Sequence, residues 1–198
     1  MNIQSSFVKE QIEASAQVKL KMAESEVVES ILRAAEYVID ALQSGGKVLL
    51  CGNGGSAADS QHIAAELVGR YKLNRKGLAA IALTTDSSIL TSVGNDYGYH
   101  DVFRRQVEAL GKRGDVLIGI TTSGSSKNVI LAMKEAKEKG MITIGLVGEK
   151  KETMKNLADV IISVPSDETP RIQEAHILVG HIICELVEKF FFEKEVGE

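Results

Sequence analysis

His62 and Glu66 carry side chains that can bind metal ions or transfer protons, and they are four residues apart. In a helix this spacing places both on one face, one turn from each other. Imidazole nitrogen and carboxylate oxygen are common ligands of zinc and related ions, so the pair suggests a metal site. A simple surface ion pair is the alternative. The two residues alone do not decide between a metal site and an ion pair.

His181 is a third candidate, set in the apolar sequence Val-Gly-His-Ile-Ile near the end of the chain. A histidine in such surroundings can be a hydrogen-bonded part of the core. Beside the mouth of an active site, it would instead serve as a general acid or base, or as a metal ligand. Gln173, eight residues earlier, would lie on the same broad side of a helix.

Two loops have the composition of phosphate-binding sites. Residues 51–56 read Cys-Gly-Asn-Gly-Gly-Ser, where glycines let the backbone approach a ligand and Asn53 and Ser56 add donors. They match neither a Walker loop nor a dinucleotide fingerprint, so a tight turn without a ligand stays open. Residues 121–126 read Thr-Thr-Ser-Gly-Ser-Ser, and helix capping explains only one or two of these five hydroxyls. Together the loops favour a ligand with a phosphate and several hydroxyls, such as a sugar phosphate.

The polar sequence Gly-Asn-Asp-Tyr-Gly at 94–98 offers further contacts. An amide and a carboxylate can bind vicinal hydroxyls, so Asn95 and Asp96 are candidates for holding a sugar, with a plain turn as the alternative. Arg70, one turn after Glu66, is also a candidate, although a solvated helix end explains it equally well.

Alternating strands and helices must position these residues. Helical spacing covers 4–44 and stops at Gly45 and Gly46. Five short apolar runs predict buried strands at 47–51, 80–83, 116–120, 142–147 and 160–164. We expect helices at 57–69, 87–93, 102–110, 127–139, 153–157 and 171–195, with a loop at 94–100.

The pattern predicts a doubly wound α/β fold of the flavodoxin-like type. Strands that alternate with helices pair in parallel, and strands without polar alternation are covered on both faces. Ligands of such sheets bind outside the carboxyl ends of the strands. No linker divides the sequence, so we expect one domain over 1–198, with an N-terminal helical segment (1–44) and an α/β core ending in a long C-terminal helix (45–198).

Composition argues against several other classes. A net charge of −4 predicts no nucleic-acid or membrane partner, and 5% aromatic residues without tryptophan make a nucleotide ligand unexpected. Cys51 and Cys184 follow no metal-ligand spacing and are predicted to be free thiols in a reducing compartment. The N-terminus has no signal-type apolar core and no stretch reaches the roughly 20 residues that span a bilayer, so we expect a cytoplasmic protein.

Five segments together resemble the sugar isomerase (SIS) family, and within it the phosphoheptose isomerases. They are CGNGGS (51–56), QHIAAELVGRY (61–71), VGNDYG (93–98), GDVLIGITTSGSSKNV (114–129) and RIQEAHILVGH (171–181). The resemblance covers nearly the whole chain. It implies conversion of sedoheptulose 7-phosphate to D-glycero-D-manno-heptose 7-phosphate through an enediol, for bacterial heptose and lipopolysaccharide biosynthesis. It also implies a homotetramer with sites at subunit interfaces.

The resemblance also implies roles for individual residues. Glu66 and His181 match the family's catalytic acid–base pair. Zinc would be held by His62, Glu66, Gln173 and His181, with a structural, inhibitory or activating role left open. The positions that match substrate contacts are Asn53, Gly54, Gly55, Ser56, Glu66, Asn95, Asp96, Thr121, Thr122, Ser123, Ser126 and Gln173, of which the hydroxyl loop would hold the phosphate.

Two other functions stay open. One relative in the family is a non-enzymatic partner of the bacterial replication initiator, but it lacks the catalytic acid and the late histidine, so Glu66 and His181 argue against that role. The other is an SIS isomerase or sensor for a pentose or hexose phosphate.

Overall fold

The computed structural model describes residues 5–193 and contains a five-stranded parallel sheet in the order β2-β1-β3-β4-β5. The strands are β1 (Val48–Gly52), β2 (Ala80–Ala82), β3 (Val116–Thr121), β4 (Ile142–Val147) and β5 (Val160–Ser163). This is the flavodoxin-like order, so the predicted fold class is confirmed. The order reverses direction at β1 and β3, and ligands bind at such switch points in open α/β sheets.

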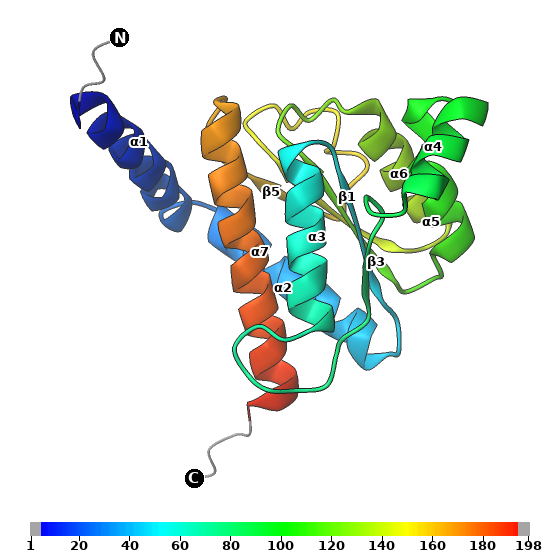
Figure 1. The fold of residues 1–198 in the computed structure, drawn as a ribbon. Coiled ribbons are helices and arrows are strands. Elements are labelled where there is room, and N and C mark those ends of the chain that lie inside the picture. Colours follow the sequence, from blue (N-terminus) through cyan, green and yellow to red (C-terminus); the bar gives the residue numbers. More distant parts are fainter. Residues whose placement is uncertain (1–4, 194–198) are drawn as a thin grey trace.

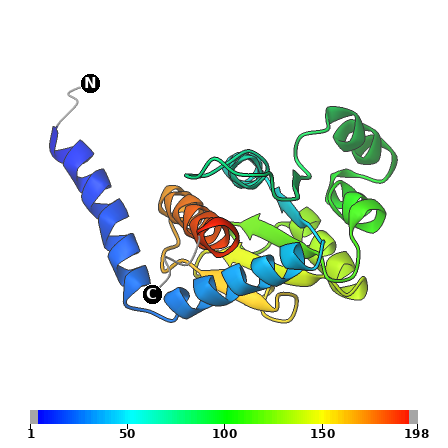
Figure 2. The same cartoon turned by 90° about the horizontal axis from the view of Figure 1, so that it is seen from below.

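Seven helices and one 3-10 turn surround the sheet in the described part of the chain (Figure 1). They are α1 (Ser5–Ala23), α2 (Val27–Gln43), α3 (Gly55–Val68), α4 (Ser87–Asp96), η1 (Tyr99–Asp101), α5 (Arg104–Leu110), α6 (Lys127–Glu138) and α7 (Thr169–Phe192). In both views α1 projects from the body of the fold, and α7 runs beside α3 (Figures 1 and 2).

Hydrophobic side chains pack on both faces of the sheet. Leu50, Ile118 and Ile144 are register partners on neighbouring strands and are buried in one cluster with α2, α3 and α7. Alternate strand residues point to opposite faces, so Leu49 and Leu117 belong to a second cluster with α5 and α6. The predicted coverage of both faces is therefore confirmed. No helix in the described part of the chain is long and apolar enough to cross a membrane.

The predicted helical segment 4–44 consists of two helices, α1 and α2, in the described part of the chain. The hydroxyl of Ser25 donates to the Met22 carbonyl at 2.9 Å and accepts from the Val27 N–H at 3.4 Å. Such local side-chain bonds compete with the helical ladder and break it between α1 and α2. The predicted start at residue 4 lies outside the described residues.

The predicted loop 94–100 is wrong at its start, because α4 continues to Asp96. The helix begins where the Asp86 carboxylate accepts from the Ile89 N–H at 2.9 Å, and it ends before Gly98, whose φ of 93° suits glycine. The predicted helix 153–157 is also wrong, since these residues form turns. A segment this short does not repay the cost of helix nucleation.

The last helix begins two residues before its predicted start, at Thr169, with Pro170 in its first turn. Proline is well suited to that position because its missing N–H would have no partner in the helix. Residues 194 and 195 of the predicted helix lie outside the described residues. The carboxyl ends of β1 and β3 lead directly into α3 and α6, and this arrangement positions the two predicted loops at one edge of the sheet.

Candidate active site

His62, Glu66 and His181 meet between α3 and α7. The Nε2 atoms of the two imidazoles are 2.9 Å apart, and the Nε2 atom of His62 lies 3.3 Å from the Glu66 carboxylate. The rings meet edge to face, with centroids 5.1 Å apart. Glu66 and His181 are half-buried, whereas the side chain of His62 is 49% exposed, so the group faces the surface of this chain.

The donor set fits a metal ion. One ligand atom from each of these three residues lies within 4.8 Å of the other two. Two ligands on a tetrahedral zinc ion with bonds of about 2.0–2.1 Å are roughly 3.3 Å apart, close to the spacings found here. Two imidazoles and a carboxylate are also a ligand set that zinc accepts in catalytic sites. The arrangement can therefore hold zinc with small adjustments.

Gln173 lies near the beginning of α7, with its side-chain amide against Gly55 at the start of α3. A Cβ atom at position 55 would collide with this amide, so only glycine permits the contact. Within residues 5–193 no hydrogen bond joins Gln173 to the two imidazoles or to the Glu66 carboxylate. The structure thus places the fourth predicted ligand at the same helix pair but nearer the glycine loop.

Two residues that the sequence analysis did not single out lie beside the imidazoles. Asp59 precedes His62 by one turn of α3, and its Oδ2 atom is buried without a hydrogen-bond partner among the described residues. Burial raises the pKa of this carboxyl, and the neighbouring His62 opposes the rise. The ring of Tyr71 lies 5.8 Å from the ring of His181. Asp59 could have been found from the three-residue spacing to His62, whereas Tyr71 follows only from tertiary packing.

Asn53 and Asn128 tie the glycine loop to α6. Each amide donates to the other's oxygen, at 2.9 and 2.8 Å, and Asn128 is only 4% exposed. The Tyr99 hydroxyl also donates to the Asn53 oxygen at 3.3 Å. Asn128 and Tyr99 were not predicted as site residues. Gly54, Gly55 and Ser56 lie next to Asn53 at the start of α3, where Ser56 is buried and the two glycines are exposed.

The hydroxyl loop has an inner and an outer set of side chains. Thr121 is buried, and its hydroxyl lies 2.9 Å from that of Ser126 and 3.4 Å from that of Ser123. Thr122 and Ser123 instead line a cavity of about 200 Å³. The cavity brings together the loops after β3, β4 and β5, and its lining residues are Thr122, Ser123, Glu149, Lys150, Ser166, Asp167 and Thr169. The hydroxyls and the Lys150 ammonium can bind a phosphate, whereas the Glu149 and Asp167 carboxylates repel one and restrict where it can lie.

Asn95 and Asp96 are exposed at the end of α4, where the Asn95 amide donates to the Asp96 carboxylate at 2.8 Å. Helix α3 separates α4 from α7 in both views (Figures 1 and 2). The structure therefore does not bring these two residues to the imidazoles of this chain.

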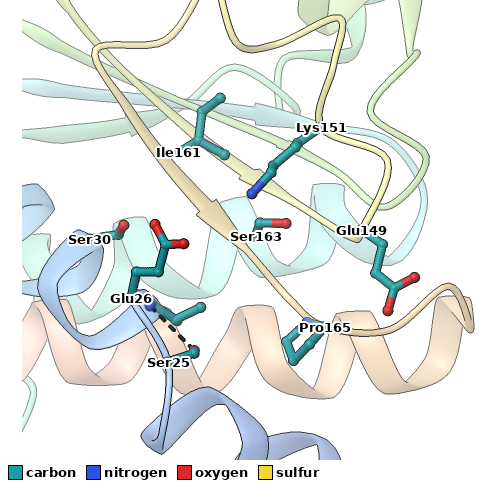
Figure 3. Close-up of a pocket in the computed structure, with 9 residues that line it drawn as sticks. Ser25, Glu26, Ser30, Glu149, Lys151, Ile161, Ser163 and Pro165 are labelled. Carbon is teal, nitrogen blue, oxygen red and sulfur yellow. Dashed lines mark hydrogen bonds between the residues drawn. The ribbon is translucent and has the colours of Figure 1, made fainter.

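A cavity of about 270 Å³ at the edge strand β5 contains none of the predicted site residues (Figure 3). The turn between α1 and α2 contributes Ser25 and Glu26 to it, and Lys151 from the loop after β4 points toward Glu26, while Glu149 lies at the other end of the cavity near Pro165. The two cysteines are buried and free, as predicted, and burial raises the pKa of each thiol to about 12. Neither thiol is therefore suited to act as a nucleophile.

Comparison with known proteins identifies the family. The family model described as SIS domain matches residues 12–148. The chain is 55% identical over 193 residues to the phosphoheptose isomerase of Clostridium acetobutylicum, covering 97% of this chain and 98% of that protein. The chain belongs to the phosphoheptose isomerase family of SIS domain proteins. A phosphoheptose isomerase of Helicobacter pylori is also 55% identical, over 88% of this chain and 91% of that protein.

Two solved structures of phosphoheptose isomerases superpose closely on this chain. Phosphoheptose isomerase GmhA from Neisseria gonorrhoeae superposes with a TM-score of 0.88 at 45% identity, covering 93% of this chain and 98% of that one. A phosphoheptose isomerase from Francisella tularensis gives a TM-score of 0.90 at 38% identity, covering 94% of this chain and all of that one. The helix pair and the strand-end loops described above therefore belong to a complete phosphoheptose isomerase fold.

Proposed function

We propose that the chain isomerises sedoheptulose 7-phosphate to D-glycero-D-manno-heptose 7-phosphate. The observation that carries this proposal is the convergence of His62, Glu66 and His181 between α3 and α7, in a chain 55% identical to a phosphoheptose isomerase over nearly its whole length. The substrate has a phosphate at one end and hydroxyls along its length, which suits the cavity at Thr122 and Ser123.

Proton transfer between C1 and C2 is the chemistry we assign to Glu66 and His181. The Glu66 carboxylate removes a proton from C1 of the ketose, and the electrons of that C–H bond form the C1–C2 double bond of an enediol while the C2=O π electrons move to O2, which takes a proton from His181. In the second half the proton on Glu66 returns to C2, and O1 gives its proton to His181 as the C1=O bond of the aldose forms. The His181 imidazole serves the two oxygens, because a neutral imidazole carries one donor and one acceptor nitrogen.

The hydroxyl loop holds the phosphate in this account. The N-terminus of α6 directs unpaired N–H groups and the positive end of the helix dipole toward the carboxyl edge of the sheet. Thr122 and Ser123 add hydroxyl donors from the cavity wall. Asn53, held by Asn128, lies at the neighbouring strand end and is placed to bind sugar hydroxyls.

Zinc is the metal we assign to the donor set. His62, Glu66 and His181 would hold it, and Gln173 would join them after a change of side-chain rotamer. A bound zinc ion would supply a Lewis acid that polarises a carbonyl oxygen. It would occupy the lone pairs of Glu66 and His181 that proton transfer uses, so we assign the proton transfers to the site without the ion. The residues of this chain would orient the sugar and move the protons.

We further propose a cytoplasmic homotetramer whose heptose product enters lipopolysaccharide synthesis. Helix α1 exposes large apolar side chains to solvent, including Phe7 at 61% and Ile12 at 65% exposure. A groove of about 400 Å³ between α1 and α7 adds to this apolar surface. Burial of such a patch against further copies of the chain would stabilise an assembly. Light scattering, which measures the mass of the assembly, tests this on the native protein and on Ile12→Glu. Lys9→Glu changes an exposed charged position on the same helix and is the control.

Turnover of sedoheptulose 7-phosphate by the purified protein tests the function. Ribose 5-phosphate and fructose 6-phosphate serve as the pentose and hexose comparisons. Selective conversion of the heptulose is the expected result. A folded protein that converts none of the three sugars would contradict the proposal and favour a binding role.

A further inference from the structure

Glu188 is a buried carboxylate on α7, seven residues after His181. It is 2% exposed and accepts backbone N–H bonds from Tyr71 at 3.1 Å, Lys72 at 2.7 Å and Leu73 at 2.9 Å. Three consecutive N–H groups thus bind one side chain. The segment that follows α3 is therefore held against the C-terminal half of α7.

Arg75 completes this arrangement and connects it to α3. Its Nε atom donates to Glu188 at 2.6 Å, and both side chains are nearly inaccessible to solvent, at 1% and 3%. Its other nitrogens donate to the carbonyls of Glu66 at 2.7 Å and Leu67 at 2.9 Å. These carbonyls lie in the last turn of α3. The ion pair thus connects the backbone of Glu66, at the end of α3, to α7, the helix that carries His181.

A buried ion pair is weak evidence of a purely stabilising role. The cost of removing two charges from water offsets much of their attraction, and apolar replacements are often as stable. Here burial raises the pKa of Glu188, but the donors from Leu73, Lys72, Arg75 and Tyr71 outweigh it and hold that pKa at about 2. The carboxylate is therefore charged throughout the physiological range. Its contacts all go to the segment after α3, at Tyr71, Lys72, Leu73 and Arg75.

That conformation decides where Tyr71 lies. The Tyr71 N–H is bound by Glu188, and the Tyr71 ring lies 5.8 Å from the His181 ring at an interplanar angle of 31°. The Nε2 atom of the same imidazole lies 2.9 Å from the Nε2 atom of His62. His181 therefore has an aromatic ring and an imidazole as neighbours, and both restrict its orientation.

We infer that Glu188, Arg75 and Tyr71 are positioning residues that fix the orientation of His181 toward His62 and Glu66. Glu188 and Arg75 set the path of the segment after α3, and the Tyr71 ring restrains the imidazole. The effect on turnover rests on the proposed isomerase function, whereas the restraint on His181 does not.

Two substitutions at position 71 separate the ring from the hydroxyl. Tyr71→Ala removes the ring, and Tyr71→Phe keeps it. Asn74→Ala, an exposed position in the same segment, is the matched control. Glu188→Gln keeps the size of the side chain and removes its charge. The His181 resonance in a spectrum of ¹³C-labelled histidines, assigned with His181→Gln, reports the ring contact without any turnover.

Tyr71→Ala is expected to shift the His181 resonance and to lower kcat by about tenfold or more, because small displacements of a catalytic group are costly. KM should change little, and Tyr71→Phe and Asn74→Ala should match the native protein in both readouts. Glu188→Gln should move the His181 resonance in the same direction as Tyr71→Ala.

An unchanged His181 resonance in folded Tyr71→Ala would overturn the inference, as would an unchanged kcat. If Glu188→Gln fails to fold, the two Tyr71 variants still decide the question. If the native protein converts no sugar phosphate, the proposed function fails, while the resonance still tests whether Tyr71 restrains His181.

Discussion

The Nε2 atoms of His62 and His181 lie 2.9 Å apart, although 119 residues separate them in the sequence. A hydrogen bond at this distance needs one ring to present an N–H proton and the other a lone pair. A metal ion at the same place would replace that proton and bind both lone pairs.

Zinc binding should therefore depend on both imidazoles. We expect the native chain to bind one zinc ion per subunit in equilibrium dialysis, with affinity that decreases as pH is lowered, because protons compete for the same nitrogens. His62→Gln and His181→Gln should each abolish this site. His100→Gln is the control, since His100 pairs with Asp101 away from the cluster. Equal zinc binding by all four proteins would contradict the assigned ligands.

Thr122→Ala should weaken substrate binding more than it slows the chemical step. The lost hydroxyl would have donated to a charged phosphate, and such bonds contribute about 1.5–3 kcal/mol, or roughly a 10- to 100-fold rise in KM. Ser125→Ala in the same loop is the comparison, because the Ser125 hydroxyl does not line the cavity and reaches it only through its hydrogen bond to Ser123 at 3.0 Å, so a smaller effect is expected. Steady-state kinetics of the two variants test this. An unchanged KM in Thr122→Ala would place the phosphate elsewhere.

Asn128→Ala should affect both stability and substrate binding. The substitution leaves the Asn53 amide without its reciprocal partner, so we expect a loss of about 1–3 kcal/mol in the free energy of unfolding. Asn53 would then lose its fixed orientation, and KM should rise. Denaturant unfolding and kinetics on the same preparation measure the two effects. A loss of stability with native KM would show that the amide pair only supports the fold.

His176 should make stability depend on pH between about 6.5 and 4. The residue is fully buried, and burial lowers its pKa from 6.5 to about 4. In this window the unfolded chain binds a proton that the folded chain does not, so the free energy of unfolding decreases as pH falls. His176→Leu should flatten the dependence in urea unfolding curves measured across the window. A curve identical to that of the native protein would show that His176 binds protons equally in the folded and unfolded chain, and would contradict the lowered pKa.

The sequence predicted those parts of the site that depend on local geometry. The one-turn spacing of His62 and Glu66 is fixed by any helix, and the two loops are placed together because parallel strands end at the same edge of the sheet. Helix ends were predicted less well. Gly94 was expected to end α4, but the backbone there is helical, and the chain turns only at Gly98.

Long-range packing accounts for what the sequence did not predict. Tyr71 reaches His181 because Glu188 binds the segment after α3, and Asn128 reaches Asn53 because β1 and β3 are adjacent. No local pattern indicates either contact. Asn95 and Asp96 match a family motif, yet in this chain they end α4 away from α7. Their proposed part in substrate binding therefore depends on an assembly of several copies.

The comparison of native protein with Glu66→Gln on sedoheptulose 7-phosphate tests the central claim most directly. The amide keeps the shape of the side chain but cannot accept the C1 proton, and positioned acid–base groups contribute roughly 10²–10⁴-fold to rates. We predict that kcat falls by at least about 10²-fold while calorimetry shows nearly native binding of the sugar phosphate. A variant that keeps more than about a tenth of the native kcat would contradict the assignment of Glu66 as the base.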